Sequence, residues 1–498
     1  MSKLMIFELD GGTWDVIDPL IEQGRLPNLA RLKKEGAWGI LRSTKPMISP
    51  VVWATIFTGK TREQHGVRAF DAGSQQVRCK RLWDIAHEQG LVCGVCGSLS
   101  TWPPYDVGAF MIPDIMARGP ETIPERLSLL QELVLQQLHG TGKSGIGALA
   151  YAGYALKMQR VGVKLQTLLA MAREVTLTQL ATRPRRESYW RRALLLQQVY
   201  ADIFERLYRV HQPDLVTYHY HAVDTLSHKY WHYSFPETFD VPVEEVSQYH
   251  EVIPSAYEAA DRVLGQFLRM ADRDTALMVL SDHGFCTSSE AHSRHTARLV
   301  RWIEVLGLKQ AAVPIRLGRQ HFLYFDDAVQ VEPIAQVLTS TYVKETGNPA
   351  LRTVETRDDS LFFVPALERA NGMTVVVPGY GEWPFDELFR DDGHVTSGVH
   401  HQEGIVIVSG PQIRPGIELS DASVIDATPN MLTLLGLSIA RDMDGKIWTE
   451  MFTDRTRSHT PISCVDTYES EKPVEISAAY TDEEREHLYR RLEDLGYL

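Results

Sequence analysis

Short apolar runs separated by amphipathic stretches predict an alternation of strands and helices along much of the chain. The apolar runs are rich in β-branched residues and lack a polar face, which is typical of strands buried in a parallel sheet. They lie at about 4–9, 91–97, 213–224 and 276–280, with a further run after His400 and another strand expected from Gly66. Helices are expected at about 13–23, 27–35, 50–57, 80–89 and 257–271. This order predicts an α/β fold of the doubly wound kind.

One strand ends in residues that can bind a metal. The apolar run ending at Leu280 stops at Ser281, and Asp282, His283 and Gly284 follow. In open α/β sheets ligands bind at the carboxyl ends of strands, and Gly284 is expected to permit a turn that brings both polar side chains to one ion. A carboxylate with an imidazole suits zinc or a similar metal. For this motif alone, the alternative is that Asp282 caps the next segment.

Two other strands end in the same way. Asp10 follows the first strand, and Asp224 lies near the end of the strand that starts at about 213. His228 comes four residues after Asp224, a spacing that places both on one face of a helical turn and suits a shared ion. His219 and His221 alternate with tyrosines inside that strand, and we expect them to pack in the core or to contact metal ligands from behind.

Ser49 and Pro50 mark the start of an apolar helix. We predict that the Ser49 hydroxyl is the N-cap and that Pro50 is the first helical residue. Such a hydroxyl can simply cap the helix. However, a helix N-terminus also stabilises negative charge, and a metal nearby would lower the pKa of the hydroxyl, so Ser49 is also a candidate nucleophile.

The chain is expected to form a core in three parts, interrupted by two insertions. Long helical patterns at 126–138, 156–180 and 188–208 predict a helical insertion, and a region rich in Gly, Pro and charge is expected to be an irregular lid, where His295 has no metal-ligand spacing. In the C-terminal tail we expect a helix that starts with a capping box at Thr481. The predicted segments are 1–120, 210–289 and 396–452 for the core, 121–209 for the helical insertion, 290–395 for the lid, and 453–498 for a tail with a docked helix.

Composition narrows the function and the compartment. A net charge of -13 over 498 residues argues against nucleic-acid binding. Five cysteines are few and odd in number, which favours reduced thiols. We see no secretion signal before the first strand and no apolar segment long enough to cross a bilayer, so we expect a cytoplasmic protein. The oligomeric state is left open.

Six motifs occur in the order of a known family. They are LDGGTWD, SPVVWATIFTG with QHGV, the pair Asp224 and His228, SDHGF, GVHHQEGIVIVSGP and IDATPNMLTLLGL. With them the chain resembles the alkaline phosphatase superfamily, in particular its type I phosphodiesterase/nucleotide pyrophosphatase branch. This resemblance implies a mixed, mostly parallel sheet sandwiched by helices.

The resemblance also implies a centre with two divalent ions, usually zinc, with manganese as an alternative. One ion would be held by Asp224, His228 and His400. The other would be held by Asp10, Asp282, His283 and the Ser49 hydroxyl.

The implied activity is hydrolysis of a small phosphate ester, most readily a phosphodiester, through a covalent phospho-Ser49 intermediate. Two alternatives are transfer of the phosphoryl group to an alcohol and a catalytically silent binding protein. The nucleotide pyrophosphatases carry an Asn shortly after their HGI-like motif, but Phe70 stands near that place here. We therefore predict that Arg68 binds the substrate, and nucleotide specificity stays open.

Overall fold

The computed structural model divides the chain into two compact units. The first comprises Met1–Leu226, Glu251–Phe285 and His401–Tyr480, and the second comprises Ser227–His250, Cys286–His400 and Thr481–Leu498. The structure describes residues 3–132, 148–179, 185–239, 241–287, 295–309, 311–317, 320–325, 327–357, 359–366, 372–391, 397–459, 463–469, 488–489 and 492.

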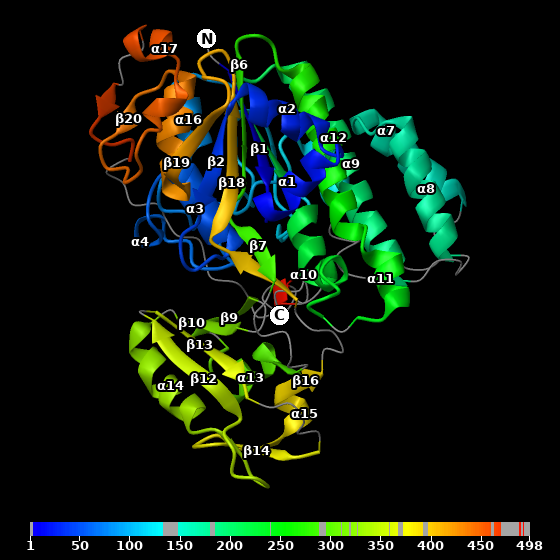
Figure 1. Cartoon of the computed structure of the whole chain (residues 1–498), viewed down its shortest axis with the longest axis vertical. Coiled ribbons are helices and arrows are strands. Elements are labelled where there is room, and N and C mark those ends of the chain that lie inside the picture. Colours follow the sequence, from blue (N-terminus) through cyan, green and yellow to red (C-terminus); the bar gives the residue numbers. More distant parts are fainter. Residues whose placement is uncertain are drawn as a thin grey trace. The chain divides into compact units, whose positions relative to one another are not determined.

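The first unit is built on an eight-stranded sheet with the order β19-β2-β18-β6-β1-β5-β3-β4 (Figure 1). Its strands are β1 (Lys3–Leu9), β2 (Ala37–Arg42), β3 (Cys93–Cys96), β4 (Gly108–Ile112), β5 (Leu215–Tyr220), β6 (Thr275–Leu280), β18 (Glu403–Ser409) and β19 (Ile417–Ser423). Among these eight strands, β18 alone runs antiparallel to its neighbours β6 and β2. The prediction of a mixed, mostly parallel sheet is therefore confirmed.

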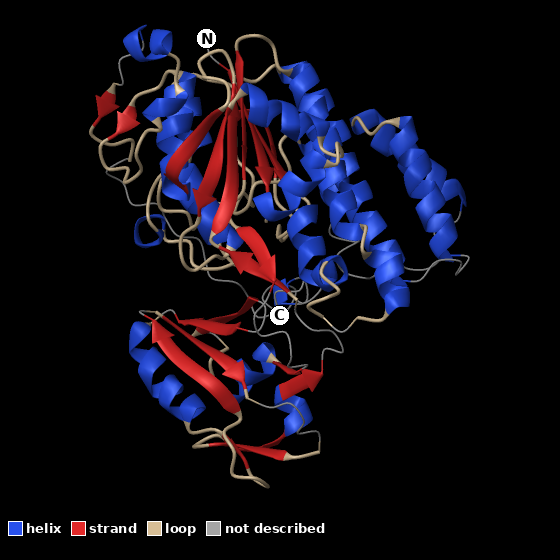
Figure 2. Cartoon of the chain, in the orientation of Figure 1, coloured by secondary structure: helices blue, strands red, loops and turns tan. Residues whose placement is uncertain are grey.

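Helices cover both faces of this sheet because successive side chains of a strand point to opposite sides (Figure 2). Ile6 of β1 belongs to one apolar cluster with Trp53 and Met431, which lie on α3 (Ser49–Thr58) and α16 (Ala427–Leu435). The next residue, Phe7, packs edge-on against Phe267 of α12 (Val252–Met270), with ring centroids 5.3 Å apart. The expected arrangement of a sheet between helices is confirmed.

Most predicted helices of the core are present with small shifts at their ends. They are α1 (Trp14–Glu22), α2 (Pro27–Glu35), α3, α5 (Leu82–Glu88) and α12. The prediction of a strand from Gly66 was wrong, because α4 (Arg62–His65) is followed by turns up to α5. That segment is tied to its surroundings by single backbone bonds, such as Ser74 N–H to the Trp102 carbonyl at 2.7 Å, and not by a strand ladder.

The described part of the region predicted as a helical insertion contains long helices, although one expected helix is observed as two. The pattern at 156–180 divides into α7 (Ala148–Val161) and α8 (Leu165–Gln179), and α9 (Arg185–His211) follows. Gly162 lies between α7 and α8 with φ of +126°, and a Cβ there would stand 2.8 Å from Cδ of Arg206. Of the helix expected at 126–138, residues 128–132 are helical and 133–138 lie outside the described residues.

The second unit has regular structure where we expected an irregular segment. It contains a four-stranded antiparallel sheet with the order β12-β13-β10-β9. The helix α14 (Val331–Thr339) packs against β12 of this sheet. Its strands are β9 (Ala312–Leu317), β10 (Gln320–Phe325), β12 (Leu351–Arg357) and β13 (Ser360–Pro365). A smaller sheet contains β11 (Tyr342–Val343), β14 (Thr374–Val377) and β15 (Gly381–Pro384), and β8 (His295–Ala297) pairs with β16 (Phe389–Asp391). The prediction of an irregular region at 290–395 was wrong, and its role as a lid stays a prediction.

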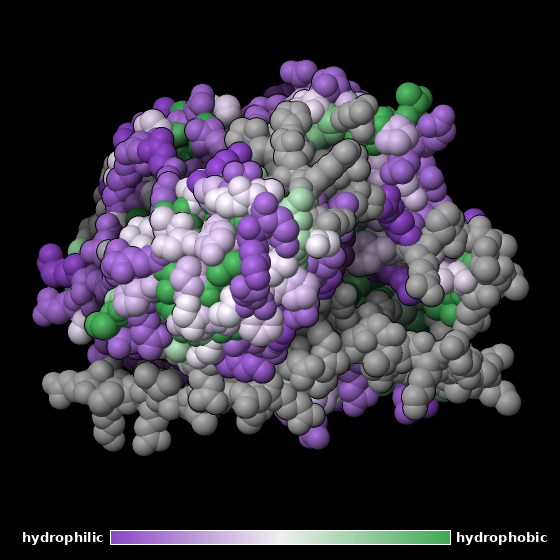
Figure 3. Space-filling model, turned by 90° about the horizontal axis from the view of Figure 1, so that it is seen from below, coloured by the Kyte–Doolittle hydropathy of each residue, from purple (hydrophilic) through white to green (hydrophobic). Residues whose placement is uncertain are grey.

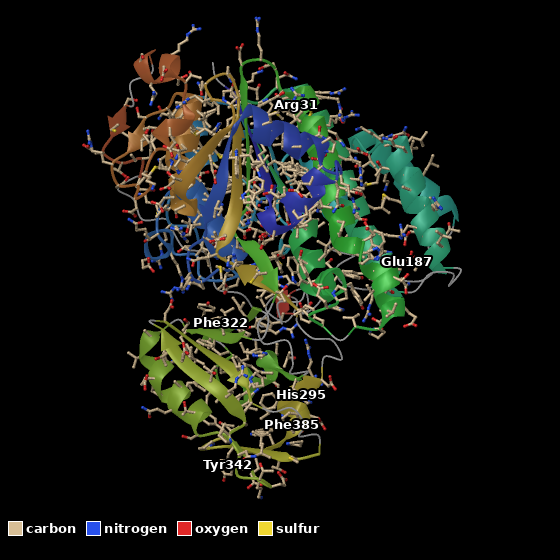
Figure 4. The ribbon with its side chains drawn as sticks, viewed as in Figure 1. Arg31, Glu187, His295, Phe322, Tyr342 and Phe385 are labelled. Carbon is tan, nitrogen blue, oxygen red and sulfur yellow. The ribbon has the colours of Figure 1, made fainter. Side chains whose placement is uncertain are left out.

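Side chains of the second unit explain one histidine that the sequence left without a role. The ring of His295 packs edge-on against Phe385, with centroids 5.3 Å apart, and both are labelled in Figure 4. His295 is thus a packing residue of this unit. The predicted C-terminal helix lies mostly outside the described residues, of which Leu488, Tyr489 and Leu492 are helical and buried.

Among the described helices, none combines the length and the apolarity that a membrane crossing requires. On the face of the molecule drawn in Figure 3, apolar side chains form separate spots between hydrophilic ones.

Candidate active site

The sheet brings the predicted ligands of the first unit to one edge. Asp10 follows β1 and Asp282 and His283 follow β6, while Asp224 lies in the first turn of α10 (Ala222–Ser234), directly after β5. The three strands β5, β1 and β6 are neighbours and run parallel. Their carboxyl ends therefore meet at the same edge, where ligands bind in such sheets.

Three carboxylates, those of Asp282, Asp10 and Asp224, lie around the Nε2 atom of His283. Its distances are 3.3 Å to Oδ2 of Asp282, 3.8 Å to Oδ1 of Asp10 and 3.9 Å to Oδ1 of Asp224. Ligand atoms of Asp10, Asp224 and His283 all lie within 4.8 Å of one another. The second ring nitrogen of His283, Nδ1, lies 3.1 Å from the Gly284 carbonyl, to which it donates, so Nε2 is the nitrogen that can accept.

Burial makes these carboxylates suited to a cation. Asp10 and Asp282 are almost completely buried, and among the described residues neither Oδ1 of Asp10 nor Oδ2 of Asp282 has a hydrogen-bond partner. Burial, followed by the charges of Asp282 and Asp224, raises the pKa of Asp10 well above its ordinary value. A bound cation would offset both the lost hydration and the repulsion between the carboxylates. The donor set of this edge therefore fits a divalent metal.

Ser49 lies beside this group and does not cap its helix. The N-cap residue of α3 is Ile48, Ser49 is the first helical residue, and no side chain caps this end. The prediction that Ser49 is the N-cap was therefore wrong by one position. Its Oγ is buried and lies 3.3 Å from Nε2 of His283, within hydrogen-bonding reach. The hydroxyl thus faces the carboxylate and imidazole group instead of the end of its own helix.

Two further predicted ligands contact each other in the second unit. His228 lies one turn after Asp224 on α10, and its Nε2 is 2.9 Å from Nε2 of His400 in β17 (Gly398–His401). Both histidines are buried. Two imidazole nitrogens this close are typical of ligands that converge on one ion.

Glu8 is a site residue that the sequence analysis missed. It lies two residues before Asp10, so both point to the same face of the sheet, and this spacing was the available signal. His219 lies between them, with Nδ1 2.9 Å from Oε2 of Glu8 and Nε2 3.1 Å from Oδ2 of Asp10. Burial disfavours a charged ring, but these two contacts outweigh it and raise the pKa of His219 to about 10. His219 thus contacts a candidate ligand from behind.

Its neighbour His221 is different. Its ring lies against the side-chain amide of Gln197, with Nδ1 of His221 2.9 Å from Nε2 of Gln197. Burial lowers the pKa of His221 to about 3. His221 is therefore a neutral packing residue.

A narrow pocket opens next to the start of α3. It holds about 310 Å³ of unfilled space, including solvent at its mouth, and Pro50, Phe70 and Arg118 are among the residues that line it. The Arg118 guanidinium lies over the ring of Trp102, 5.3 Å from its centroid. Arg68 lies in the loop after α4 and is half-buried. Phe70 thus lies near the helix start, while substrate binding by Arg68 stays a prediction.

The fold and the site together define an α/β protein whose buried Asp and His groups are consistent with a centre of two metal ions. Comparison with known families agrees with this class. Residues 4–356 match the family described as Type I phosphodiesterase / nucleotide pyrophosphatase. This match covers more than half of the chain, so the protein belongs to that family, whose members act on phosphate esters.

Solved structures give more distant matches. Human ectonucleotide pyrophosphatase/phosphodiesterase 5 is 13% identical, with a TM-score of 0.47, and the match covers 90% of this chain and 98% of that one. An inactive variant of the murine enzyme, in complex with AMP, is 14% identical with the same TM-score, and the match covers 91% and 100% of the two chains. No curated protein matches the sequence.

Proposed function

We propose that this protein is a metal-dependent phosphodiesterase that cleaves a small phosphate ester through a covalent phospho-Ser49 intermediate. One observation carries the proposal: the Ser49 hydroxyl lies 3.3 Å from His283 Nε2, at an edge where buried carboxylate oxygens of Asp10 and Asp282 have no described partner. A buried hydroxyl in such a group is suited to act as a nucleophile on phosphorus.

Seven residues would hold two divalent ions. We assign Asp10, Asp282, His283 and the Ser49 hydroxyl to one ion, and Asp224, His228 and His400 to the other. The spacing of Asp224 and His228 on α10 and the contact between His228 and His400 support the second set. Oxygen and imidazole ligands fit zinc, with manganese as an alternative. Bound ions of this kind polarise a phosphoryl oxygen and favour ionisation of a hydroxyl.

The chain itself positions the nucleophile. The N-terminus of α3 carries the positive end of the helix dipole, which favours negative charge at Ser49 or on a phosphoryl group held there. All ten residues of α3 are buried, so packing fixes its direction. In the first step the Ser49 hydroxyl gives up its proton and its Oγ–P bond forms, while the bond from phosphorus to the leaving oxygen breaks and the leaving alcohol takes up a proton. Water then attacks phosphorus and the Ser49 Oγ–P bond breaks. The water oxygen stays on the phosphate product, and a proton returns to Oγ.

Metal analysis and a substrate panel test this function. The protein, purified without chelator, should contain two ions per chain. It should hydrolyse an aryl phosphodiester faster than the corresponding monoester, phosphonate or sulfate ester. Less than one ion per chain would contradict the proposal. Full metal content without turnover on the panel would favour a silent binding protein, and a phosphorylated alcohol formed from an added acceptor would favour transfer.

Arg68 and the compartment complete the proposal. We infer that Arg68 binds a phosphoryl oxygen, in which case Arg68→Ala should raise KM more than it lowers kcat, and an unchanged KM would contradict this role. We also infer that the protein works in the cytoplasm, because none of its five cysteines, all of which are described, forms a disulfide. A count of free thiols tests that inference.

A further inference from the structure

Three buried residues form a hydrogen-bonded chain behind Asp10. Glu8 accepts at Oε1 from the hydroxyl of Ser98 at 2.5 Å, and its Oε2 lies 2.9 Å from Nδ1 of His219. Nε2 of His219 reaches Oδ2 of Asp10 at 3.1 Å. Glu8 and Ser98 have no exposed surface, and His219 is 5% exposed. A glutamate without solvent needs this degree of pairing, because an unpaired buried charge is strongly unfavourable.

Strand register brings these residues together. Glu8 and Asp10 lie two positions apart and point to the same face, and Glu8 is the register partner of His219 in the parallel pair β1 and β5. Ser98 follows β3, the next strand of the sheet, and also contacts Thr217 of β5 at 2.8 Å. The position of the His219 ring is therefore set by three adjacent strands.

His219 determines which oxygen Asp10 presents to the site. Nδ1 of His219 lies within hydrogen-bonding distance of Oε2 of Glu8, and Nε2 of the same ring lies within hydrogen-bonding distance of Oδ2 of Asp10. Oδ2 of Asp10 is thus engaged. Oδ1, which has no hydrogen-bond partner among the described residues, lies 3.8 Å from Nε2 of His283. The arrangement matches the way outer-shell hydrogen bonds orient a metal-binding carboxylate.

The same ring also contacts the helix of the nucleophile. Trp53 lies one turn after Ser49 on α3, and its ring packs edge-on against His219, with centroids 5.2 Å apart and planes at 79°. His219 therefore touches both the helix that starts at Ser49 and the carboxylate of Asp10.

We propose that His219, held in place by Glu8, is a positioning residue that orients Asp10 and sets the affinity of the protein for the ion that Asp10 binds. This inference rests on the proposed function, since it requires the metal centre. It adds a pair of residues that do not themselves bind the metal or the substrate.

Metal affinity tests this role without relying on turnover. Each ion is titrated by chelator competition in the wild type, in His219→Leu and in Glu8→Gln, and the cobalt-substituted proteins are compared by absorption spectroscopy. Loss of an outer-shell partner lowers metal affinity by about 10- to 100-fold. In His219→Leu we expect this loss of affinity for one ion, together with a changed cobalt spectrum. In Glu8→Gln the loss should be smaller, because glutamine has nearly the volume of glutamate and keeps one side-chain oxygen that can accept a hydrogen bond. The other ion should bind as in the wild type.

His321→Gln is the matched control. His321 is also fully buried and accepts from the Ala297 N–H at 3.0 Å, but it belongs to β10 of the second unit. This variant should lose stability without a change in metal affinity or cobalt spectrum. Wild-type affinity and spectrum in both His219→Leu and Glu8→Gln would overturn the inference. If His219→Leu does not fold, Glu8→Gln decides alone. A wild type that binds no metal would instead contradict the proposed function.

Discussion

At the residue scale, the position of one hydroxyl separates two roles for Ser49. A capping serine accepts from a backbone N–H of its own helix, but no side chain caps α3. The hydroxyl lies instead beside His283, which is 234 residues away in the chain. A nucleophile and a cap differ in what their loss costs, so substitution can distinguish them.

Ser49→Ala should abolish most of the turnover and leave stability almost unchanged. Loss of a serine nucleophile lowers the rate by about three to six orders of magnitude. The free energy of unfolding should change by less than the roughly 1 kcal/mol of a lost cap. Ser49→Thr keeps the hydroxyl and should retain substantial activity. Near-normal turnover in the alanine variant, with both metals bound, would show that water attacks phosphorus directly.

His65 should make the protein sensitive to acid. Val67 N–H donates to its Nδ1 at 3.1 Å, so the other nitrogen, 3.1 Å from the Thr55 hydroxyl, carries the proton of a neutral ring. Burial lowers the pKa of His65 from 6.5 to about 4. Between pH 4 and pH 6.5, His65 therefore binds a proton in the unfolded chain but not in the folded protein. Stability is therefore fully present above pH 6.5 and falls, by about 3 kcal/mol at most, as the pH drops to 4.

Urea unfolding at pH 7.5 and pH 5 measures this effect. The wild type should lose more stability between the two pH values than His65→Gln, whose side chain does not titrate. His250→Gln, at an exposed histidine, should behave like the wild type. Equal losses in the wild type and His65→Gln would mean that His65 does not titrate in this range.

At the scale of the elements, the close contact of β6, β7 (Gly284–Thr287) and β18 decides where His283 points. We expected Gly284 to permit a sharp turn, but its φ is not positive. Glycine is required there for another reason, since a Cβ would stand only 2.1 Å from the Glu403 carbonyl oxygen of β18. The residue after His283 must therefore lack a side chain for the strands to come this close.

Gly284→Ala should consequently cost both stability and activity. The added methyl group has to displace the backbone of β18 or of His283, and overpacking of this kind costs about 1–3 kcal/mol. Turnover should fall because His283 moves. Gly24→Ala is the control: its φ is +73° and no atom lies within 4 Å of the added Cβ, so strain of about 1 kcal/mol is expected with normal turnover. Normal turnover in Gly284→Ala would show that this contact is not needed for the site.

At the scale of the whole molecule, the environment of the cysteines bears on the compartment. Cys93 and Cys96 are buried in β3, as the apolar run around them indicated, and none of the five described cysteines forms a disulfide. Burial raises the pKa of Cys93 to about 12, and it also raises the pKa of Cys96 well above its ordinary value. These two thiols should therefore be unreactive while the protein is folded.

Thiol titration should give five free groups in denaturant. Under native conditions the exposed Cys464 should react first, and Cys93 and Cys96 should not react. Cys93→Ser is a control that should lower the denatured count by one. Fewer than four thiols in the denatured protein would contradict a cytoplasmic location.

The sequence by itself determined the buried strands, the helices around them and the residues at the strand ends. This was possible because strand and helix patterns are local, and because parallel strands bring their carboxyl ends to one edge. It did not determine the sheets of the second unit, where charged residues and glycines obscure the alternation. Only the tertiary structure placed Ser49 beside His283 and His219 between Glu8 and Asp10, because these contacts join strands and helices that lie up to 234 residues apart in the chain.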